Sequence, residues 1–183
     1  IATIDNFLPI AIESIKDQTF DGFICHLLMG ELPDGELNKL KAIISNDERF
    51  VVHQLSLGGI AFALNYGINQ SETQYIARMD GDDIALQTRL AEQVTYMEAH
   101  PNLVALSNWG EKFGDARGRI ITPTSTAGIR ATSLFVSPIV HASCIMRISI
   151  LRKYQITYRP NCPLEDFDLW VRLSKIGDLA ALP

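Results

Sequence analysis

The order of apolar and polar positions along the chain switches repeatedly between a helical and a strand period. Apolar residues recur every three or four positions in four segments, which predicts amphipathic helices over residues 7–18, 37–44, 60–68 and 83–99. Short apolar runs separate these segments and predict buried strands over residues 23–29, 50–55 and 75–79. Strands that alternate with helices through short loops indicate βαβ units, so we expect a largely parallel sheet with helices on its faces.

The second half of the chain, after Pro101, has a less regular pattern. The turn-rich, polar stretch 110–118 suggests a hairpin. Around it the pattern predicts two further strands and two further helices, over residues 103–109, 142–146, 129–135 and 164–176. The chain contains no internal repeat and no low-complexity segment, so we expect a single α/β domain over residues 1–183.

Composition and charge limit the classes of protein to consider. The chain has 183 residues, of which 47% are hydrophobic, enough for one domain with its own core. Its net charge of −5 argues against a protein that binds a nucleic-acid backbone, which would need a basic excess. No apolar run approaches the ~18–20 residues that cross a bilayer.

Three cysteines, Cys25, Cys144 and Cys162, form an odd set without a C-x-x-C spacing. A disulfide framework or a cysteine zinc site is therefore not expected, and reduced thiols suit a cytoplasmic protein. The chain begins at Ile1 and stops at Pro183 directly after an apolar stretch, so we expect a piece that is truncated at both ends.

An acidic cluster, Asp80-Gly81-Asp82-Asp83, follows the predicted strand 75–79. In sheets of parallel strands, ligands gather at the carboxyl ends of the strands. Clustered carboxylates repel one another, and Mg²⁺ or Mn²⁺, which prefer oxygen ligands, would relieve this repulsion. Alternatively, Asp82 or Asp83 caps the helix that follows. Arg78 either offsets the negative charge or lies on the sheet surface.

A second acidic group, Glu165-Asp166, opens the predicted helix after Pro163. Acids in a first turn are favoured by the helix dipole alone, which is one interpretation. The other is catalytic: a carboxylate across a site from a metal can take a proton from a hydroxyl group. Asp166 is then the candidate base, and Glu165 the neighbour that positions it. His141 is a further candidate as metal ligand, base or phosphate contact, although a lone histidine is more often structural.

Taken together, these motifs resemble the family 2 glycosyltransferases, which have the GT-A fold, over nearly the whole chain. Residues 58–65 resemble the segment written N-x-G-x-x-x-A-x-N, which ends here at Asn65, and residues 75–83 resemble the metal-binding strand end. Residues 141–147 resemble H-P-S-x-x-x-R, and residues 165–172 resemble E-D-x-D-L-W-x-R.

The resemblance implies a function and a role for each matching residue. It implies an inverting enzyme of bacterial surface-polysaccharide synthesis, with residues 1–100 as the nucleotide-sugar half and 101–183 as the acceptor half. Asp80 and Asp82 would form the D-x-D pair, with Asp82 the direct metal ligand. Asp166 would be the base, and Trp170 would contact the acceptor or, more in keeping with its size, belong to the core.

The resemblance also implies the partners. The donor would be a nucleotide sugar, with UDP as the expected nucleotide, and the cofactor Mn²⁺ or Mg²⁺. The acceptor would be a glycan or a lipid-linked saccharide, which allows peripheral contact with the inner face of the membrane. Besides Asp80 and Asp82, the donor-binding candidates are Arg78, Asn65 and Asp34.

Two departures from the family pattern concern the nucleoside end of the donor site. The family's second strand ends in one or two aspartates, whereas this chain has Met29 and Gly30 there, with Glu31 or Asp34 as possible substitutes. The first strand is nearly missing, because only residues 1–4 could supply it. Two alternatives follow: a catalytically inactive relative that serves as a binding domain, or a nucleotidyltransferase. The second lacks support, since no glycine-rich basic phosphate loop is visible.

Overall fold

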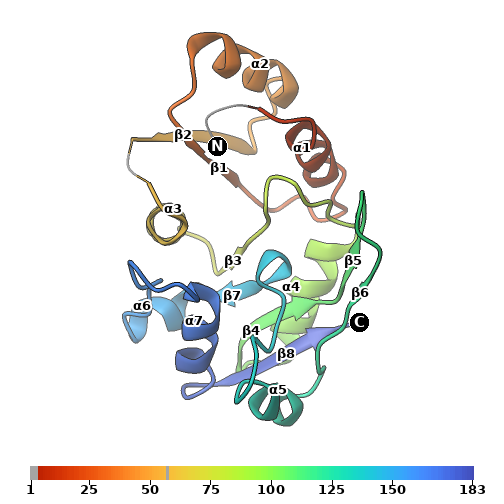
Figure 1. Ribbon diagram of the computed structural model, residues 1–183, viewed down its shortest axis with the longest axis vertical. Helices are drawn as coiled ribbons and strands as arrows, with labels where there is room; N and C mark the ends of the chain where they lie inside the picture. The colour runs from red at the N-terminus through yellow and green to blue at the C-terminus, as the bar shows by residue number, and fades with distance from the viewer. Residues whose placement is uncertain (1–3, 57) are drawn as a thin grey trace. The chain divides into compact units, whose positions relative to one another are not determined.

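Helices and strands alternate in the predicted order as far as residue 108 (Figure 1). The sequence pattern does not predict the helix Ile148–Lys153 or the strand Asp178–Leu182. The computed structural model describes residues 4–56 and 58–183, so the first strand predicted for residues 1–4 lies almost entirely outside the described residues. The chain divides into two compact units. The first unit comprises residues 1–70 and 80–91, and the second unit comprises residues 71–79 and 92–183.

The first unit is built on two parallel strands, β1 and β2, paired from Cys25↔Phe50 to Gly30↔Leu55. Met29 and Phe50 face a core that α1 and α2 complete, with Ile12 and Leu40 fully buried in it. The opposite face of the strand pair is covered by α3, where Leu28 packs against Gly67. The elements are α1 Leu8–Lys16, β1 Cys25–Gly30, α2 Asp34–Ile44, β2 Phe50–Leu55 and α3 Ile60–Gln70.

A chain of polar side chains lies on the α3 face of this strand pair. His26 Nδ1 is 2.9 Å from His53 Nε2, and His53 Nδ1 is 3.1 Å from Tyr66 Oη. Burial, with a smaller contribution from His53, lowers the pKa of His26. His26 and His53 come from adjacent strands and Tyr66 from α3, so the three groups join the helix to the sheet.

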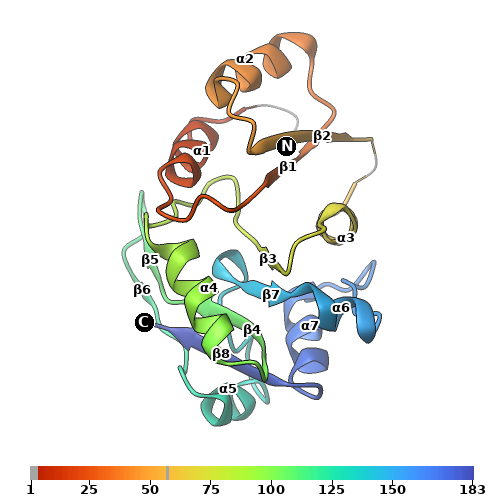
Figure 2. The ribbon, with the colours of Figure 1, turned by 180° about the vertical axis from the view of Figure 1, so that it is seen from behind.

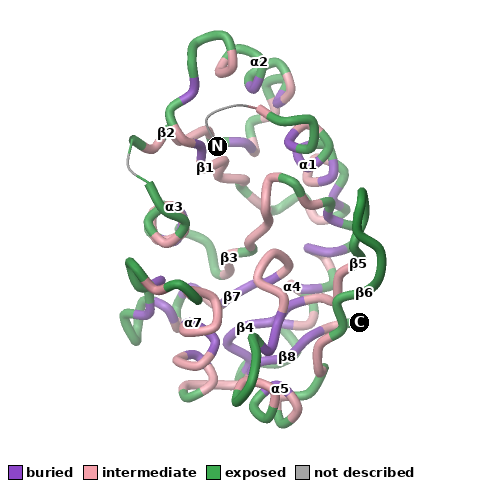
Figure 3. Tube along the Cα trace, viewed as in Figure 1, coloured by how far each residue is buried: buried purple, intermediate pink, exposed green. Residues whose placement is uncertain are grey.

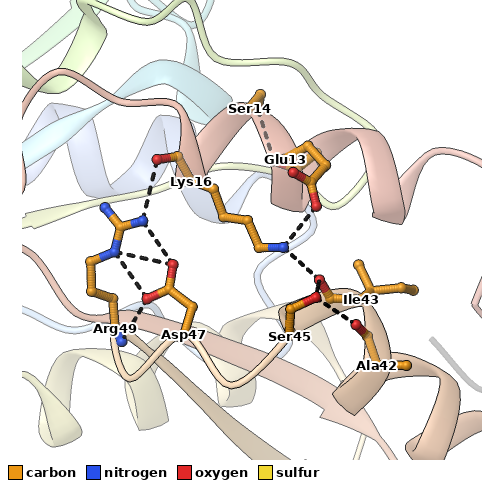
Figure 4. Close-up of polar contacts among 9 residues, drawn as sticks. Glu13, Ser14, Lys16, Ala42, Ile43, Ser45, Asp47 and Arg49 are labelled. Atoms are coloured by element: carbon orange, nitrogen blue, oxygen red, sulfur yellow. Dashed lines mark hydrogen bonds and ion pairs between the residues drawn. The ribbon is translucent and has the colours of Figure 1, made fainter.

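An ion network on the other side of the first unit connects α1 to the segment between α2 and β2 (Figure 4). Lys16 Nζ donates to Glu13 Oε1 at 2.7 Å and to the carbonyl of Ile43 at 2.6 Å. Arg49 donates to both carboxylate oxygens of Asp47 and, at 3.2 Å, to the carbonyl of Lys16. The Arg49 hydrogen bonds lower the pKa of Asp47 to about 2.

The second unit contains a four-stranded sheet in the order β3-β7-β4-β8. β4 and β8 are parallel, whereas β7 runs antiparallel to both of its neighbours. The predicted parallel arrangement therefore holds for β1–β2 and β4–β8, and β7 makes the larger sheet mixed. The predicted hairpin is formed by β5 and β6. The strands are β3 Tyr75–Ala77, β4 Leu103–Asn108, β5 Gly110–Lys112, β6 Gly118–Ile120, β7 Ile145–Arg147 and β8 Asp178–Leu182.

Helices complete the core of the second unit. Met97 of α4 packs on Leu106 of β4 and Ile145 of β7, so α4 lies along one face of the sheet (Figure 2). β4 is buried from Leu103 to Ser107 and forms the centre of this core (Figure 3). The helices are α4 Arg89–Ala99, whose first turn belongs to the first unit, α5 Thr126–Thr132, the 3₁₀ turn η1 His141–Ser143, α6 Ile148–Lys153 and α7 Glu165–Leu173.

Two differences between the predicted and the observed elements concern the candidate site. The helix predicted from residue 83 begins at Arg89, and the strand predicted over 142–146 is a 3₁₀ turn followed by β7. The turn forms because the half-buried Ser143 hydroxyl donates to the carbonyl of Asn108 and accepts from its N–H, at 2.8 and 3.0 Å. None of the helices formed by the described residues is long and apolar enough to span a membrane.

Gly177 allows the turn before β8 to approach β4 closely. A Cβ atom at this position would collide with Val104 Cγ1 and lie 3.0 Å from the carbonyl oxygen of Asn102. We expect Gly177→Ala to lower the free energy of unfolding by about 1–3 kcal/mol, as overpacking of a core does. Urea unfolding measures this loss.

Gly35, inside α2, provides the matched control for this substitution. A Cβ there meets nothing within 4 Å. Gly35→Ala should therefore leave the stability unchanged or raise it by about 0.5–1 kcal/mol through helix propensity. Equal losses in both variants would show that close approach at Gly177 is not the cause.

Candidate active site

The acidic cluster forms a tight turn in the first unit. Asp80 is half-buried, Asp82 is exposed, and Asp83 N–H donates to the carbonyl of Asp80 at 3.3 Å. The helix α4 begins only at Arg89. The interpretation of Asp82 or Asp83 as a cap of that helix is therefore wrong, because a capping residue must directly precede the first turn.

Side chains of α1 explain why residues 84–88 are not helical. Ser14 Oγ accepts from the N–H of Ala85 at 3.1 Å, and Gln18 Nε2 donates to the carbonyl of Leu86 at 2.8 Å. Gln18 Oε1 accepts from the N–H of Leu90 at 3.0 Å. Because buried side chains of α1 bond these backbone groups, the segment is held out of a helical conformation and separates the acidic turn from α4.

Asp82 presents an exposed carboxylate at this turn. Within the described part of the chain its carboxylate makes no hydrogen bond and no ion pair. Among residues 4–56 and 58–183, no group of three or more His, Cys, Asp or Glu side chains is gathered closely enough to hold a metal alone. This agrees with Mg²⁺-type sites, where one or two carboxylates act together with substrate phosphates and water. The carboxylates present fit such an ion.

The second unit brings together several other predicted residues. Glu165 and Asp166 lie in the first turn of α7, which has no side-chain cap. Asp166 Oδ2 accepts a hydrogen bond from Ser137 Oγ at 3.0 Å. His141 Nε2 is 2.8 Å from Tyr158 Oη. The predicted base and the predicted histidine thus belong to one polar group.

Charges of this group act on His141. Burial lowers the pKa of His141 to about 4, with a further lowering by Arg78, while Asp166 acts in the opposite direction. The pKa of Tyr158 is raised, chiefly by burial. His141 is therefore neutral near pH 7, and its Nε2 lies within hydrogen-bond distance of the Tyr158 hydroxyl. Arg78 lies close enough to act on both rings and joins this group.

The remaining members of the α7 motif are structural. Asp168 accepts from Arg172 at 2.6 and 2.9 Å and from Arg159 at 2.9 Å, so both oxygens of its carboxylate take part in ion pairs. Trp170 is fully buried, with its ring edge-to-face against His141. The core interpretation of Trp170 is thus confirmed, and the tryptophan supports the ring of His141.

The predicted residues of the nucleoside end lie on different elements of the first unit. Asp34 is the exposed first residue of α2, and Asn65 lies on α3, which covers the opposite face of the β1–β2 pair. The Met29 side chain is buried in the core. Gly30 is the last residue of β1. Because these residues are a methionine and a glycine, neither position offers a carboxylate to a ligand.

Two residues of the site were not found from the sequence. Ser137 and Tyr158 lie 29 and 8 positions before Asp166, in segments without a periodic pattern. Neither distance along the sequence indicates that these residues lie near Asp166. The Ser137-Pro138 pair indicates only a turn or an extended segment.

Solved structures share this arrangement of elements. The S. aureus protein TarS, residues 1–349, superimposes with a TM-score of 0.78 at 18% identity, covering 97% of this chain and 54% of that one. It has also been solved with UDP and with UDP-GlcNAc. The mannosyltransferase PcManGT from Pyrobaculum calidifontis, in complex with GDP-Man and Mn²⁺, gives 0.70 at 14% identity, covering 98% and 52%. The chain thus has the predicted α/β GT-A fold.

Sequence comparison defines the family. The family model Glycosyl transferase family 2 matches residues 5–155, and the chain belongs to this family. The match includes the acidic turn and His141 and ends before α7. The predicted family is therefore confirmed.

Two curated relatives are similar along most of this chain. An uncharacterized glycosyltransferase of Haemophilus influenzae is 28% identical over 98% of this chain and 59% of its own length. The O-antigen biosynthesis glycosyltransferase WbnJ of Escherichia coli is 29% identical over 92% and 67%. This chain therefore spans about three fifths to two thirds of the length of these relatives.

Proposed function

We propose that this chain transfers a sugar from a nucleotide sugar to a saccharide acceptor, assisted by a divalent metal ion. The observation that carries the proposal is the acidic turn, in which Asp82 is exposed and has no partner in the described residues. Like charges are costly to keep together without a function or a counter-charge. Capping of α4 does not explain the acids of this turn, because the helix begins only at Arg89. The chain also belongs to a family of glycosyltransferases.

Asp80 and Asp82 would hold Mn²⁺ or Mg²⁺ together with the diphosphate of the donor. When bound, such an ion supplies positive charge where the leaving diphosphate develops negative charge. Arg78, Asn65 and Asp34 stay as proposed donor contacts, and His141 as a proposed ligand, base or phosphate contact. UDP is the proposed nucleotide, supported by the UDP and UDP-GlcNAc complexes of TarS.

Asp166 would act as the general base of an inverting single displacement. Its carboxylate is half-buried at the beginning of α7, and Ser137 occupies one of its two oxygens. Glu165, in the same turn, would position it. The proton of the acceptor hydroxyl would pass to Asp166 while the oxygen attacks the sugar, which makes the hydroxyl a stronger nucleophile.

The names of relatives support a glycan acceptor. WbnJ is named for O-antigen biosynthesis, and a further relative, from Erwinia amylovora, for amylovoran biosynthesis. We propose an acceptor that is a growing glycan or a lipid-linked saccharide. A cytoplasmic site of action, with contact to the inner face of the membrane, stays a prediction.

A donor panel tests the proposed reaction. The chain is incubated with Mn²⁺ and UDP-, GDP- and dTDP-sugars, and release of the nucleoside diphosphate is measured with and without saccharide acceptors. We expect release from one nucleotide class, and from UDP-sugars first. If the chain binds UDP yet releases no nucleoside diphosphate from any donor, the proposed reaction is contradicted. The chain would then be an inactive relative that serves as a binding domain, as the residues Met29 and Gly30 suggest.

A further inference from the structure

The carboxylate of Asp166 is held by only one of its two oxygens. Ser137 Oγ donates to Oδ2 at 3.0 Å. In the part of the chain that the structure describes, Asp166 has no other hydrogen bond and no ion pair. Oδ1 is therefore the oxygen that remains able to accept a proton.

The position of Ser137 is fixed from both sides. After it, Pro138 and Ile139 are buried, and Ile139 is only 3% exposed. Before it, the N–H groups of Phe135 and Val136 donate to the carbonyl of Thr132 at 2.9 and 3.1 Å, so the chain turns tightly after α5. A residue before proline is restricted to extended conformations. The hydroxyl of Ser137 is thus presented to α7 by an ordered backbone.

We propose that Ser137 is a positioning residue for Asp166. Its hydroxyl holds Oδ2 of the carboxylate, so that Oδ1 faces the hydroxyl group of the acceptor. This inference rests on the proposed function of Asp166 as the base. The hydroxyl proton of the acceptor moves to Oδ1, and the acceptor oxygen forms the new bond to the anomeric carbon. The bond from that carbon to the donor phosphate breaks, and its electron pair leaves with the nucleoside diphosphate.

The orientation of a base affects turnover more than it affects binding. A misplacement of about 1 Å near the reacting groups costs about a hundredfold in rate. We therefore expect Ser137→Ala to lower kcat by about tenfold to a hundredfold, with the KM for the donor unchanged. Ser137→Thr, which keeps the hydroxyl, should restore most of kcat.

Ser133 provides a matched control in the same segment. Its hydroxyl donates to the carbonyl of Arg130 at 2.8 Å, and among the described residues it makes no hydrogen bond to α7. Ser133→Ala should leave kcat and KM at wild-type values. All variants are compared by thermal unfolding, so that a loss of kcat at unchanged melting temperature reports on the site.

A double-mutant cycle separates this inference from the proposed function. Ser137→Ala should cause no further loss of kcat in an Asp166→Asn background, because the serine acts only through that carboxylate. Wild-type turnover in Ser137→Ala, equal losses in the Ala and Thr variants, or additive losses with Asp166→Asn would each overturn the inference. Wild-type turnover in Asp166→Asn alone would instead overturn the assignment of the base.

Discussion

Asp166→Asn is expected to lower the rate of sugar transfer by about 10²–10⁴-fold, the usual contribution of a general base. The amide keeps the size of the side chain and can still bond the hydroxyl of Ser137, but it cannot accept the proton of the acceptor. Donor and metal binding should stay at wild-type values. Single-turnover transfer together with calorimetric titration of UDP measures both quantities.

Asp168→Asn is the control for Asp166→Asn, since it removes a carboxylate from the same turn of α7. Asp168 is paired with Arg159 and Arg172, so its loss should lower stability rather than act on proton transfer. If Asp166→Asn loses donor binding together with turnover, Asp166 is not simply the base. Transfer at the wild-type rate in Asp166→Asn would exclude the assignment.

Asp82→Ala is expected to weaken donor binding in the presence of Mn²⁺ by at least about tenfold, since loss of a group that supports a bound metal costs about 10–100-fold in affinity. Its carboxylate is exposed and has no partner in the described residues, so folding should not depend on it. The measurement is the dissociation constant of UDP with Mn²⁺, combined with thermal unfolding.

Asp115 provides the control for Asp82→Ala. It lies exposed between β5 and β6 in the second unit, also without a partner in the described residues. Asp115→Ala should bind UDP as the wild type does. Unchanged UDP affinity in Asp82→Ala would contradict the ligand role of this carboxylate.

Much of the fold could be predicted because apolar periodicity reflects burial. Leu40 and Met97 repeat with their neighbours at helical spacing and are fully buried in the two cores. Asp166 and Glu165 could be placed at the beginning of a helix because Pro163 and the apolar face of α7 mark its start. The motif spacing then led to the family, which the comparisons confirm.

The remaining features depend on contacts between distant segments. The start of α4 at Arg89 is set by Ser14 and Gln18, which lie about 70 positions earlier and bond the backbone of residues 85–90. Local propensity alone would extend the helix back to the acidic turn. The contact of Ser137 with Asp166 spans 29 positions and has no periodic signature. A single sequence contains no signal for such pairs.

The position at which α4 begins, Arg89, affects how the acidic turn is interpreted. If Asp82 and Asp83 capped a helix, that structural role would explain why the two acids lie together. With the helix beginning six positions beyond Asp83, that explanation is lost. We propose a metal-supported diphosphate site as the reason for the exposed Asp82 carboxylate, which has no partner among the described residues.

The most direct test of this account is a calorimetric titration of UDP into the folded chain, with Mn²⁺ and again with a chelator. A metal-dependent nucleotide site should give saturable UDP binding that requires Mn²⁺ and is lost with the chelator. Absence of binding in both titrations, or equal binding in both, would contradict a metal-dependent nucleotide site at Asp80 and Asp82.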